Sequence, residues 1–207
     1  MGLSGAAPQR RIGVFGGAFD PPHNAHLALA EAAVVQLQLD VLHVVPTGQA
    51  WHKPRPLTDS AHRLAMAQLA FANHPKVVVD DCEIRRAGPS YTIDTLRALH
   101  SAAPGAQLLL VMGEDQAHSL DRWHEISAIT QLAIISIARR AENTKAEGRF
   151  DLKNLPHAVF QPLQLPLMQA SATEVRARLA AGEGVDHLVP DAVARYIAKH
   201  LLYQTTR

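Results

Sequence analysis

The chain has 207 residues, 47% of them hydrophobic and 19% charged, with a formal net charge of +1. These values favour one globular domain with a substantial core, and the near-neutral charge argues against a nucleic-acid partner. A single cysteine, Cys82, excludes an intramolecular disulfide and fits a reducing, cytoplasmic compartment. No apolar run approaches the length of a membrane span, so we expect no membrane partner.

After ten residues without an apolar run, which we expect to form a mobile tail, strand-like runs alternate with segments of helical period. We expect strands at residues 12–15, 41–45, 77–79, 108–112, 132–137 and, as the weakest candidate, 158–160. Helices are expected from about residue 23, at 58–71 and 92–99, and near 172–181 and 190–200, with Thr58 and Thr92 as N-caps. This order predicts an α/β fold, a Rossmann-like parallel sheet with helices on both faces.

Parallel sheets of this kind bind ligands beyond the carboxyl ends of their strands. The segments that follow the expected strands are therefore expected to meet at one edge, and unusual residue types collect in most of them. These segments are residues 16–26, 46–56, 80–95, 113–123 and 138–140.

The stretch from residue 11 to residue 27 holds the most distinctive chemistry. Its apolar strand ends at Gly16 and Gly17, and His23 and His26 lie three residues apart, on one face of the first turn of the next helix. Glycines allow close approach of a ligand to the backbone, and a helix N-terminus offers free N–H groups to phosphate. No cysteine, third histidine or carboxylate cluster completes a ligand set, so we predict a nucleoside triphosphate site and no protein-bound metal.

The same stretch, GGAFDPPHNAHL, resembles the G-G-x-F-D-P-x-H-x-G-H-L signature of the nucleotidyltransferase superfamily with the HIGH-like motif. Ala18 stands where Thr or Ser is usual, and Ala25 replaces the glycine of H-x-G-H. The alternative is that the two histidines are ordinary residues of a helix start. The resemblance implies catalysis by His23 and His26. It implies ATP binding by Gly16, Gly17, Phe19, His23 and His26.

The loop after the second strand reads PTGQAWHKPRP. Its composition alone favours a solvated, turn-rich loop. It also resembles the P-x-x-x-P-H-K loop of bacterial nicotinate mononucleotide adenylyltransferases, with Pro46, His52 and Lys53 in register. The resemblance implies that Lys53 binds the mononucleotide and takes part in catalysis, and Arg55 is a second candidate cation.

The segment SYTIDTL, residues 90–96, has the chemistry of a helix N-terminus, with Thr92 as N-cap and Asp94 in the first turn. It also resembles the Y-[ST]-x-D-T-L block that lines the mononucleotide pocket of the same family. The resemblance implies that Tyr91, Thr92 and Asp94 bind the mononucleotide. The backbone and hydroxyl around Thr92 would then face the carboxylate on the pyridine ring.

The block MGEDQAHSLDRWHEI follows the fourth strand and resembles the family's G-x-D-x-x-x-x-x-x-x-W element. The resemblance implies that Gly113 and Asp115 bind the nucleotide, Asp115 through a ribose or pyridine-side group, and we assign both to the ATP site. It also implies that Trp123 stacks on the mononucleotide ring, although a lone tryptophan at helical spacing is more often part of a core. His124 stands where some members have tyrosine, and its role is open.

Near the end, QASATEVRARL opens a helix, and Ser171 with Glu174 three residues later forms a capping-box pattern. The stretch also resembles the I-S-S-T-x-I-R motif, the second phosphate-binding signature of the superfamily, with Ala172 in place of the second serine. The resemblance implies that Ser171, Thr173 and Arg176 bind ATP and that Arg176 is also catalytic. The closing LVPDAVARYIAKHLLY resembles a family helix that we interpret as a packing element.

Five motifs in the family's order cover residues 11–203, so the chain is identified as a member of the bacterial nicotinate mononucleotide adenylyltransferases in one domain over 11–203. The resemblance implies ATP and nicotinate mononucleotide as substrates, deamido-NAD and pyrophosphate as products, and Mg²⁺ held through ATP phosphates and water. Oligomeric state is left open.

Two other functions compete with this interpretation. One is another adenylyl- or cytidylyltransferase, such as the pantetheine-phosphate type, and the Y-T-I-D-T-L block and Trp123 argue against it. The other is a nucleotide-binding sensor without turnover, which only Ala18, Ala25 and Ala172 support.

Overall fold

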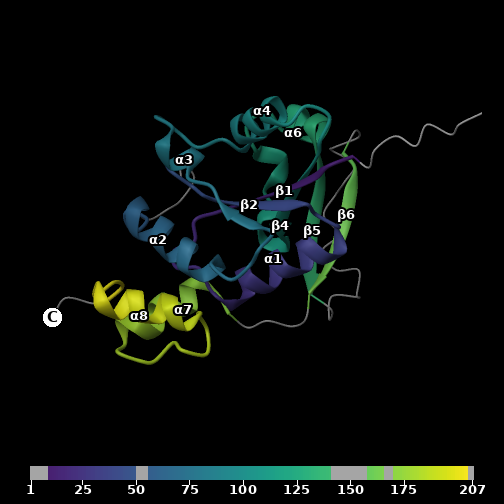
Figure 1. Ribbon diagram of the computed structural model, residues 1–207. Coiled ribbons are helices and arrows are strands. Elements are labelled where there is room, and N and C mark those ends of the chain that lie inside the picture. Colours follow the sequence, from purple (N-terminus) through teal and green to yellow (C-terminus); the bar gives the residue numbers. More distant parts are fainter. Residues whose placement is uncertain (1–8, 50–55, 141–157, 166–169, 205–207) are drawn as a thin grey trace, which may run out of the picture.

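The computed structural model describes residues 9–49, 56–140, 158–165 and 170–204. Six parallel strands form one sheet in the order β3-β2-β1-β4-β5-β6 (Figure 1). Their bounds are β1 (Arg11–Gly17), β2 (Val41–Pro46), β3 (Val77–Val79), β4 (Gln107–Gly113), β5 (Ala133–Arg140) and β6 (Phe160–Leu165). The Rossmann-like parallel sheet predicted from the sequence is confirmed.

Helices cover both faces of this sheet, as Figure 1 shows. One face carries α1 (Asn24–Gln36) and α2 (Ser60–Phe71), and the other carries α4 (Thr92–Ala102), α5 (Glu114–Ala117) and α6 (Ile126–Leu132). Short elements α3 (Cys82–Arg85) and η1 (Leu120–Arg122) complete the connections. Strand β4 is buried on both faces: Leu109 and Val111 face α1, and Leu108, Leu110 and Met112 face α4 and α6.

Two helices close the chain, α7 (Ala172–Ala180) and α8 (Asp191–Lys199). Helix α8 packs against α2, and both closing helices lie together below the sheet in Figure 1. Val175, Val193 and Ile197 are buried in the same core as α1 and α2. The C-terminal segment is therefore packed onto the helices that follow the first two strands.

The structure corrects three details of the predicted elements. Strand β6 begins at Phe160 and runs to Leu165, and not over residues 158–160. Pro162 argued against a strand in the sequence, but β6 lies at the edge of the sheet, where proline is tolerated. Helix α2 is capped by Asp59, whose carboxylate accepts the Ala61 N–H at 2.8 Å, and not by Thr58. Helix α4 begins at Thr92, so its N-cap is Tyr91.

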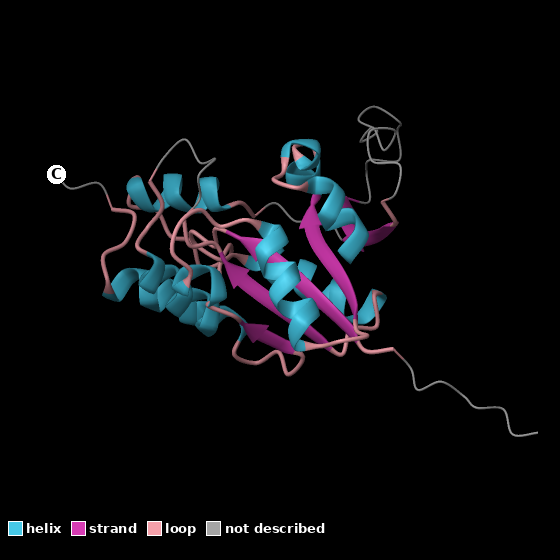
Figure 2. Cartoon of the chain, turned by 90° about the horizontal axis from the view of Figure 1, so that it is seen from above, coloured by secondary structure: helices cyan, strands magenta, loops and turns pink. Residues whose placement is uncertain are grey.

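The chain order of the strands reverses between β1 and β4. From β1 the chain adds β2 and then β3 on one side, and β4 returns to the other side of β1. Ligands of open parallel sheets bind at such a switch point, beyond the carboxyl ends of the strands. In Figure 2 the arrowheads of the central strands point toward the side of the molecule that holds the C-terminus. In the part of the chain that the structure describes, no helix has the length and apolarity to cross a membrane.

Candidate active site

The turn between β1 and α1 is built around a buried phenylalanine. Phe19 has φ of 48°, in the left-handed region, and the residue is 1% exposed. The ring meets Phe15 and Phe71 edge-on, at centroid distances of 5.4 and 6.3 Å. A Cβ on Gly17 would lie 3.2 Å from the same ring, so this glycine leaves room for it. A left-handed conformation costs a residue with a side chain roughly 1–3 kcal/mol, which the surrounding contacts must offset.

The two histidines of the motif form a stacked pair at the start of α1. His23 is the N-cap residue, and its ring lies 3.7 Å from that of His26, centroid to centroid, with 29° between the planes. The His23 backbone N–H donates to His26 Nδ1 at 3.2 Å. The neutral His26 ring therefore carries its hydrogen on Nε2, where it remains available as a donor.

Both imidazoles are neutral at pH 7. Burial lowers the pKa of His23 from 6.5 to about 4, and burial together with the neighbouring His23 lowers the pKa of His26 well below 6.5. His23 Nδ1 is buried, and no described residue gives it a hydrogen bond. Two positive charges 4 Å apart would repel by about 4 kcal/mol at an effective dielectric constant of 20. The free site thus presents neutral N–H donors to an anion.

The second phosphate-binding motif, at the start of α7, lies beside the first, which joins β1 to α1. Arg176 Nη1 donates to the Asp20 carbonyl at 2.7 Å, and its Nη2 donates to Thr173 Oγ1 at 3.2 Å. Ser171 is the N-cap of α7, as predicted, because its hydroxyl accepts the Glu174 N–H at 3.1 Å. The structure therefore places Ser171, Thr173 and Arg176 beside the turn that carries the histidines.

A buried arginine, which the sequence interpretation missed, joins three loops at this edge. Arg63 is 1% exposed and donates to the carbonyls of Thr58 at 2.8 Å, Ala18 at 2.9 Å and Gly48 at 3.4 Å. Burial lowers the pKa of Arg63, and the carboxylate of Asp20 opposes that shift. The signal in the sequence was an arginine in the apolar stripe of α2, three and four residues before Met66 and Ala67.

The described members of the predicted mononucleotide set, Tyr91, Thr92, Asp94 and Trp123, belong to the start of α4 and the segment before α6, on the sheet face opposite α1. The Tyr91 ring lies 4.2 Å from that of His124 with 30° between the planes, and Trp123 packs against the core under α4 and α6. Ser90 Oγ accepts the N–H groups of Gly48 at 3.1 Å and Gln49 at 3.2 Å. These bonds tie the loop after β2 to the start of α4. His124, whose role the sequence left open, is the stacking partner of Tyr91.

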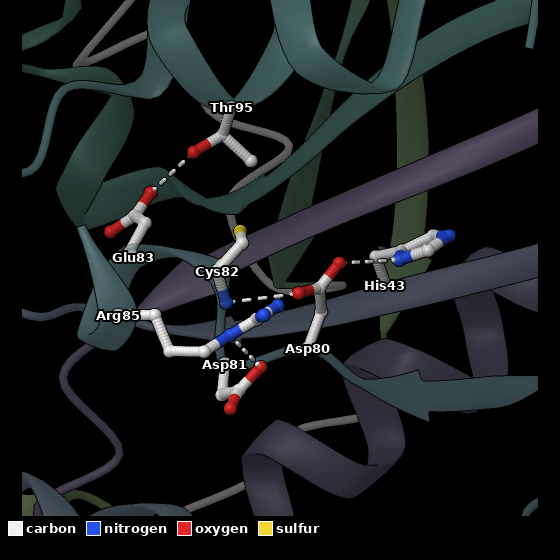
Figure 3. A network of polar contacts seen from close by, with 7 residues as sticks. All are labelled: His43, Asp80, Asp81, Cys82, Glu83, Arg85 and Thr95. Atoms are coloured by element: carbon white, nitrogen blue, oxygen red, sulfur yellow. Dashed lines mark hydrogen bonds and ion pairs between the residues drawn. The ribbon is translucent and has the colours of Figure 1, made fainter. Parts of the chain in front are cut away.

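Polar contacts join α3 to α4 and the end of β3 to β2, next to the loop after β2 (Figure 3). Thr95 Oγ1 donates to the Glu83 carboxylate at 2.9 Å, and the Asp80 carboxylate contacts His43 Nδ1 at 3.1 Å. A Cβ on Gly48 would lie 2.2 Å from the Glu83 carbonyl oxygen, so only glycine fits there. Burial raises the pKa of Cys82 to about 11, which keeps this thiol protonated and excludes it as a thiolate nucleophile at neutral pH.

The remaining predicted residues are distributed as follows. Gly16 is the next-to-last residue of β1, and Gly113 is the last residue of β4. A Cβ at either would meet no described atom within 4 Å, which leaves open space at the switch point. Asp115 is exposed on α5, and Asp94 lies in the first turn of α4. Lys53 and Arg55 lie outside the described residues.

Residues 14–178 match the family model described as cytidylyltransferase-like. The chain belongs to this family. Within the cytidylyltransferase-like family, it is similar to curated relatives named probable nicotinate-nucleotide adenylyltransferase. The relative from Albidiferax ferrireducens is 57% identical over 95% of this chain and 99% of its own length. The relative from Methylibium petroleiphilum is 43% identical over 98% of this chain and 96% of its own.

Solved structures of a nicotinic acid mononucleotide adenylyltransferase share the fold of this chain. The nicotinic acid mononucleotide adenylyltransferase of Plasmodium falciparum complexed with NaAD superposes with a TM-score of 0.77, covering 94% of this chain and 98% of its own. The same enzyme complexed with APC gives 0.74 with the same coverage. Both are 20% identical to this chain, so this likeness shows the fold alone.

The buried imidazole of this cytidylyltransferase-like site predicts acid sensitivity. The unfolded chain protonates His23 near pH 6.5, whereas the folded chain does so only near 4, so stability is full above 6.5 and falls as the pH drops toward 4. Each pH unit below 6.5 lowers the free energy of unfolding by about 1.4 kcal/mol. Protonation of His23 therefore lowers this free energy by about 2 kcal/mol between pH 7 and pH 5.

Urea unfolding of the wild type and His23→Asn at pH 7 and pH 5 tests this prediction. The variant should lose less stability on acidification than the wild type, by about that 2 kcal/mol. Replacement of the exposed His118 by asparagine is the control and should keep the wild-type pH dependence. An equal acid loss in His23→Asn and the wild type would contradict a neutral, buried His23.

Proposed function

We propose that this protein transfers the adenylyl group of ATP to nicotinate mononucleotide, giving deamido-NAD and pyrophosphate in NAD biosynthesis. The observation that carries the proposal is the stacked, neutral pair His23 and His26 at the sheet's switch point. The 57% identity to a nicotinate-nucleotide adenylyltransferase relative over nearly the full length supports the choice of reaction. The single cysteine fits a cytoplasmic enzyme.

In this reaction a phosphate oxygen of the mononucleotide attacks the α-phosphorus of ATP, and the bond to the departing pyrophosphate breaks in line. The protein's task is positioning and charge stabilisation. The imidazole N–H groups of His23 and His26 donate to phosphate oxygens, and these bonds strengthen as negative charge grows. Lys53 and Arg176 neutralise the departing pyrophosphate.

We assign the ATP site to the open strand ends and the two phosphate signatures. Gly16 and Gly113 admit the nucleotide to the backbone, Gly17 makes room for the Phe19 ring in the same turn, and Asp115 faces the nucleotide from α5. Phe19 is buried beneath His26, at a ring distance of 4.9 Å, so its part is to shape the turn. The hydroxyls of Ser171 and Thr173 face the phosphates with Arg176.

The proposed reaction uses Mg²⁺, and the side chains near the site indicate how this ion would be held. Among the described residues, no three His, Cys, Asp or Glu side chains gather in a way that could hold a metal ion. The Mg²⁺ that we propose would therefore be held mainly by ATP phosphate oxygens and water, as is usual for this ion. Bound there, it would neutralise charge on the phosphates.

We assign the mononucleotide pocket to Tyr91, Thr92, Asp94 and Trp123, with Lys53 reaching its phosphate. The N-terminus of the 11-residue helix α4 offers free N–H groups and a positive dipole end to the pyridine carboxylate. Trp123 stacks on the ring. The contact between Tyr91 and His124 fixes the rim of this pocket.

The histidine pair gives the first test of this function. His23→Ala or His26→Ala should lower kcat by about 10²–10³-fold, the usual effect of removing one preorganised donor to a developing charge. Pyrophosphate release measured with ATP and nicotinate mononucleotide gives kcat, and thermal melting shows that each variant is folded. His118→Ala, on the exposed surface, is the control. Near wild-type kcat in either site variant would remove that histidine from the mechanism.

Substrate preference gives the second test. Nicotinate mononucleotide should be preferred over the nicotinamide form, because an amide leaves buried donors at the start of α4 unpaired, at about 1–3 kcal/mol each. That cost corresponds to about tenfold to over a hundredfold in kcat/KM. The assay uses both mononucleotides and, for the competing transferase, phosphopantetheine. A ratio near one, or a preference for the amide, would contradict carboxylate recognition at Tyr91 to Thr95.

A further inference from the structure

The chain makes an unusual turn after its last helix. Helix α8 ends at Lys199, and two of the next residues, Leu201 and Tyr203, have φ of 52° and 64°. The left-handed conformation is unfavourable for residues with a side chain. Leu201 is 68% exposed, so burial of its side chain does not offset that cost. This turn directs the side chain of Tyr203 into a hydrogen bond with Asp20.

Tyr203 reaches the histidine motif at the other end of the chain. Its hydroxyl donates to Asp20 Oδ1 at 2.7 Å, and Asp20 is only 1% exposed. The other carboxylate oxygen accepts the Thr58 N–H at 3.4 Å. Burial raises the pKa of Tyr203, so the phenol stays protonated and donates at neutral pH.

Asp20 belongs to the strained turn that sets the histidines. It directly follows the left-handed Phe19 and lies three residues before His23. Its carbonyl accepts from Arg176, and the Ala18 carbonyl on the other side of Phe19 accepts from Arg63. The turn is thus held by groups from α2, α7 and the C-terminal turn, and among these bonds the Tyr203 hydroxyl donates to the Asp20 side chain.

We propose that Tyr203 is a positioning residue for adenylyl transfer, whose hydroxyl fixes Asp20 and through it the geometry of the His23–His26 pair. The inference rests on the function proposed above. Tyr203 acts through Asp20. Without its hydroxyl, a buried carboxylate oxygen loses a donor at 2.7 Å, and the turn beside it can shift. Displacements of about 1 Å in a positioned group can lower turnover by about a hundredfold.

Tyr203→Phe removes this hydroxyl and leaves the ring in place. We expect kcat with ATP and nicotinate mononucleotide to fall about 10- to 100-fold, and the KM for the mononucleotide to stay within about twofold of wild type. We expect the KM to be spared because the mononucleotide pocket is assigned to residues of α4 and of the segment before α6, and not to the turn that Tyr203 holds. A merely structural role would lower the melting temperature without this split.

Tyr196→Phe is the matched control. Tyr196 lies on α8, and its hydroxyl contacts His62 Nδ1 at 3.0 Å, so the variant also removes one hydroxyl contact between the C-terminal segment and α2. It should keep wild-type kcat. In an Asp20→Ala background, Tyr203→Phe should have little further effect, because the partner of the hydroxyl is already gone.

Kinetics and melting curves of these proteins decide the inference. Equal kcat for Tyr203→Phe and Tyr196→Phe would overturn it, as would a loss explained entirely by unfolding at the assay temperature. An equal, independent loss from Tyr203→Phe in the Asp20→Ala background would overturn the link through Asp20. A wild type that makes no deamido-NAD would instead refute the proposed function, and weaker binding of a non-hydrolysable ATP analogue to Tyr203→Phe would still report the positioning.

Discussion

Phe19 takes a left-handed conformation in the turn that joins β1 to α1, with its ring buried under His26. This turn brings the end of the first strand to the helix start where the imidazoles stack. Because the conformation is costly, contacts from elsewhere must hold it. Arg63 from α2, Arg176 from α7 and Tyr203 from the C-terminus supply them. The fold of distant segments therefore determines the shape of the site.

Burial gives the histidine pair its chemical character. Loss of solvation lowers the pKa of both rings, so the free site holds donors without charge. A polyphosphate changes this balance, because its negative charge favours the protonated imidazole. The site can therefore stabilise growing negative charge on the phosphates. When no phosphate is bound, the two stacked rings carry no positive charge and do not repel each other. Neutral preorganised donors are an effective source of transition-state stabilisation.

Much of this architecture was predictable from the sequence, because period and turn chemistry are local signals. Short apolar runs predicted five of the strands, and their alternation with helices predicted a parallel sheet. One short motif predicted that the two histidines lie together. The hydrogen bond from Tyr203 to Asp20 joins residues 183 apart, and the one from Arg63 to Ala18 joins residues 45 apart, so no local pattern predicts either. Strand β6 was misplaced because its position at the sheet edge tolerates Pro162, which a local pattern counts against a strand.

The protonation state of the two imidazoles, followed by NMR during a pH titration, tests most directly whether the site is a neutral, buried receptor for phosphate. In the free protein the His23 resonances should titrate near pH 4, and those of His26 well below 6.5. A saturating non-hydrolysable ATP analogue should raise both pKa values. Titration of both rings near 6.5 in the free protein, with no change on adding the analogue, would contradict this description of the site.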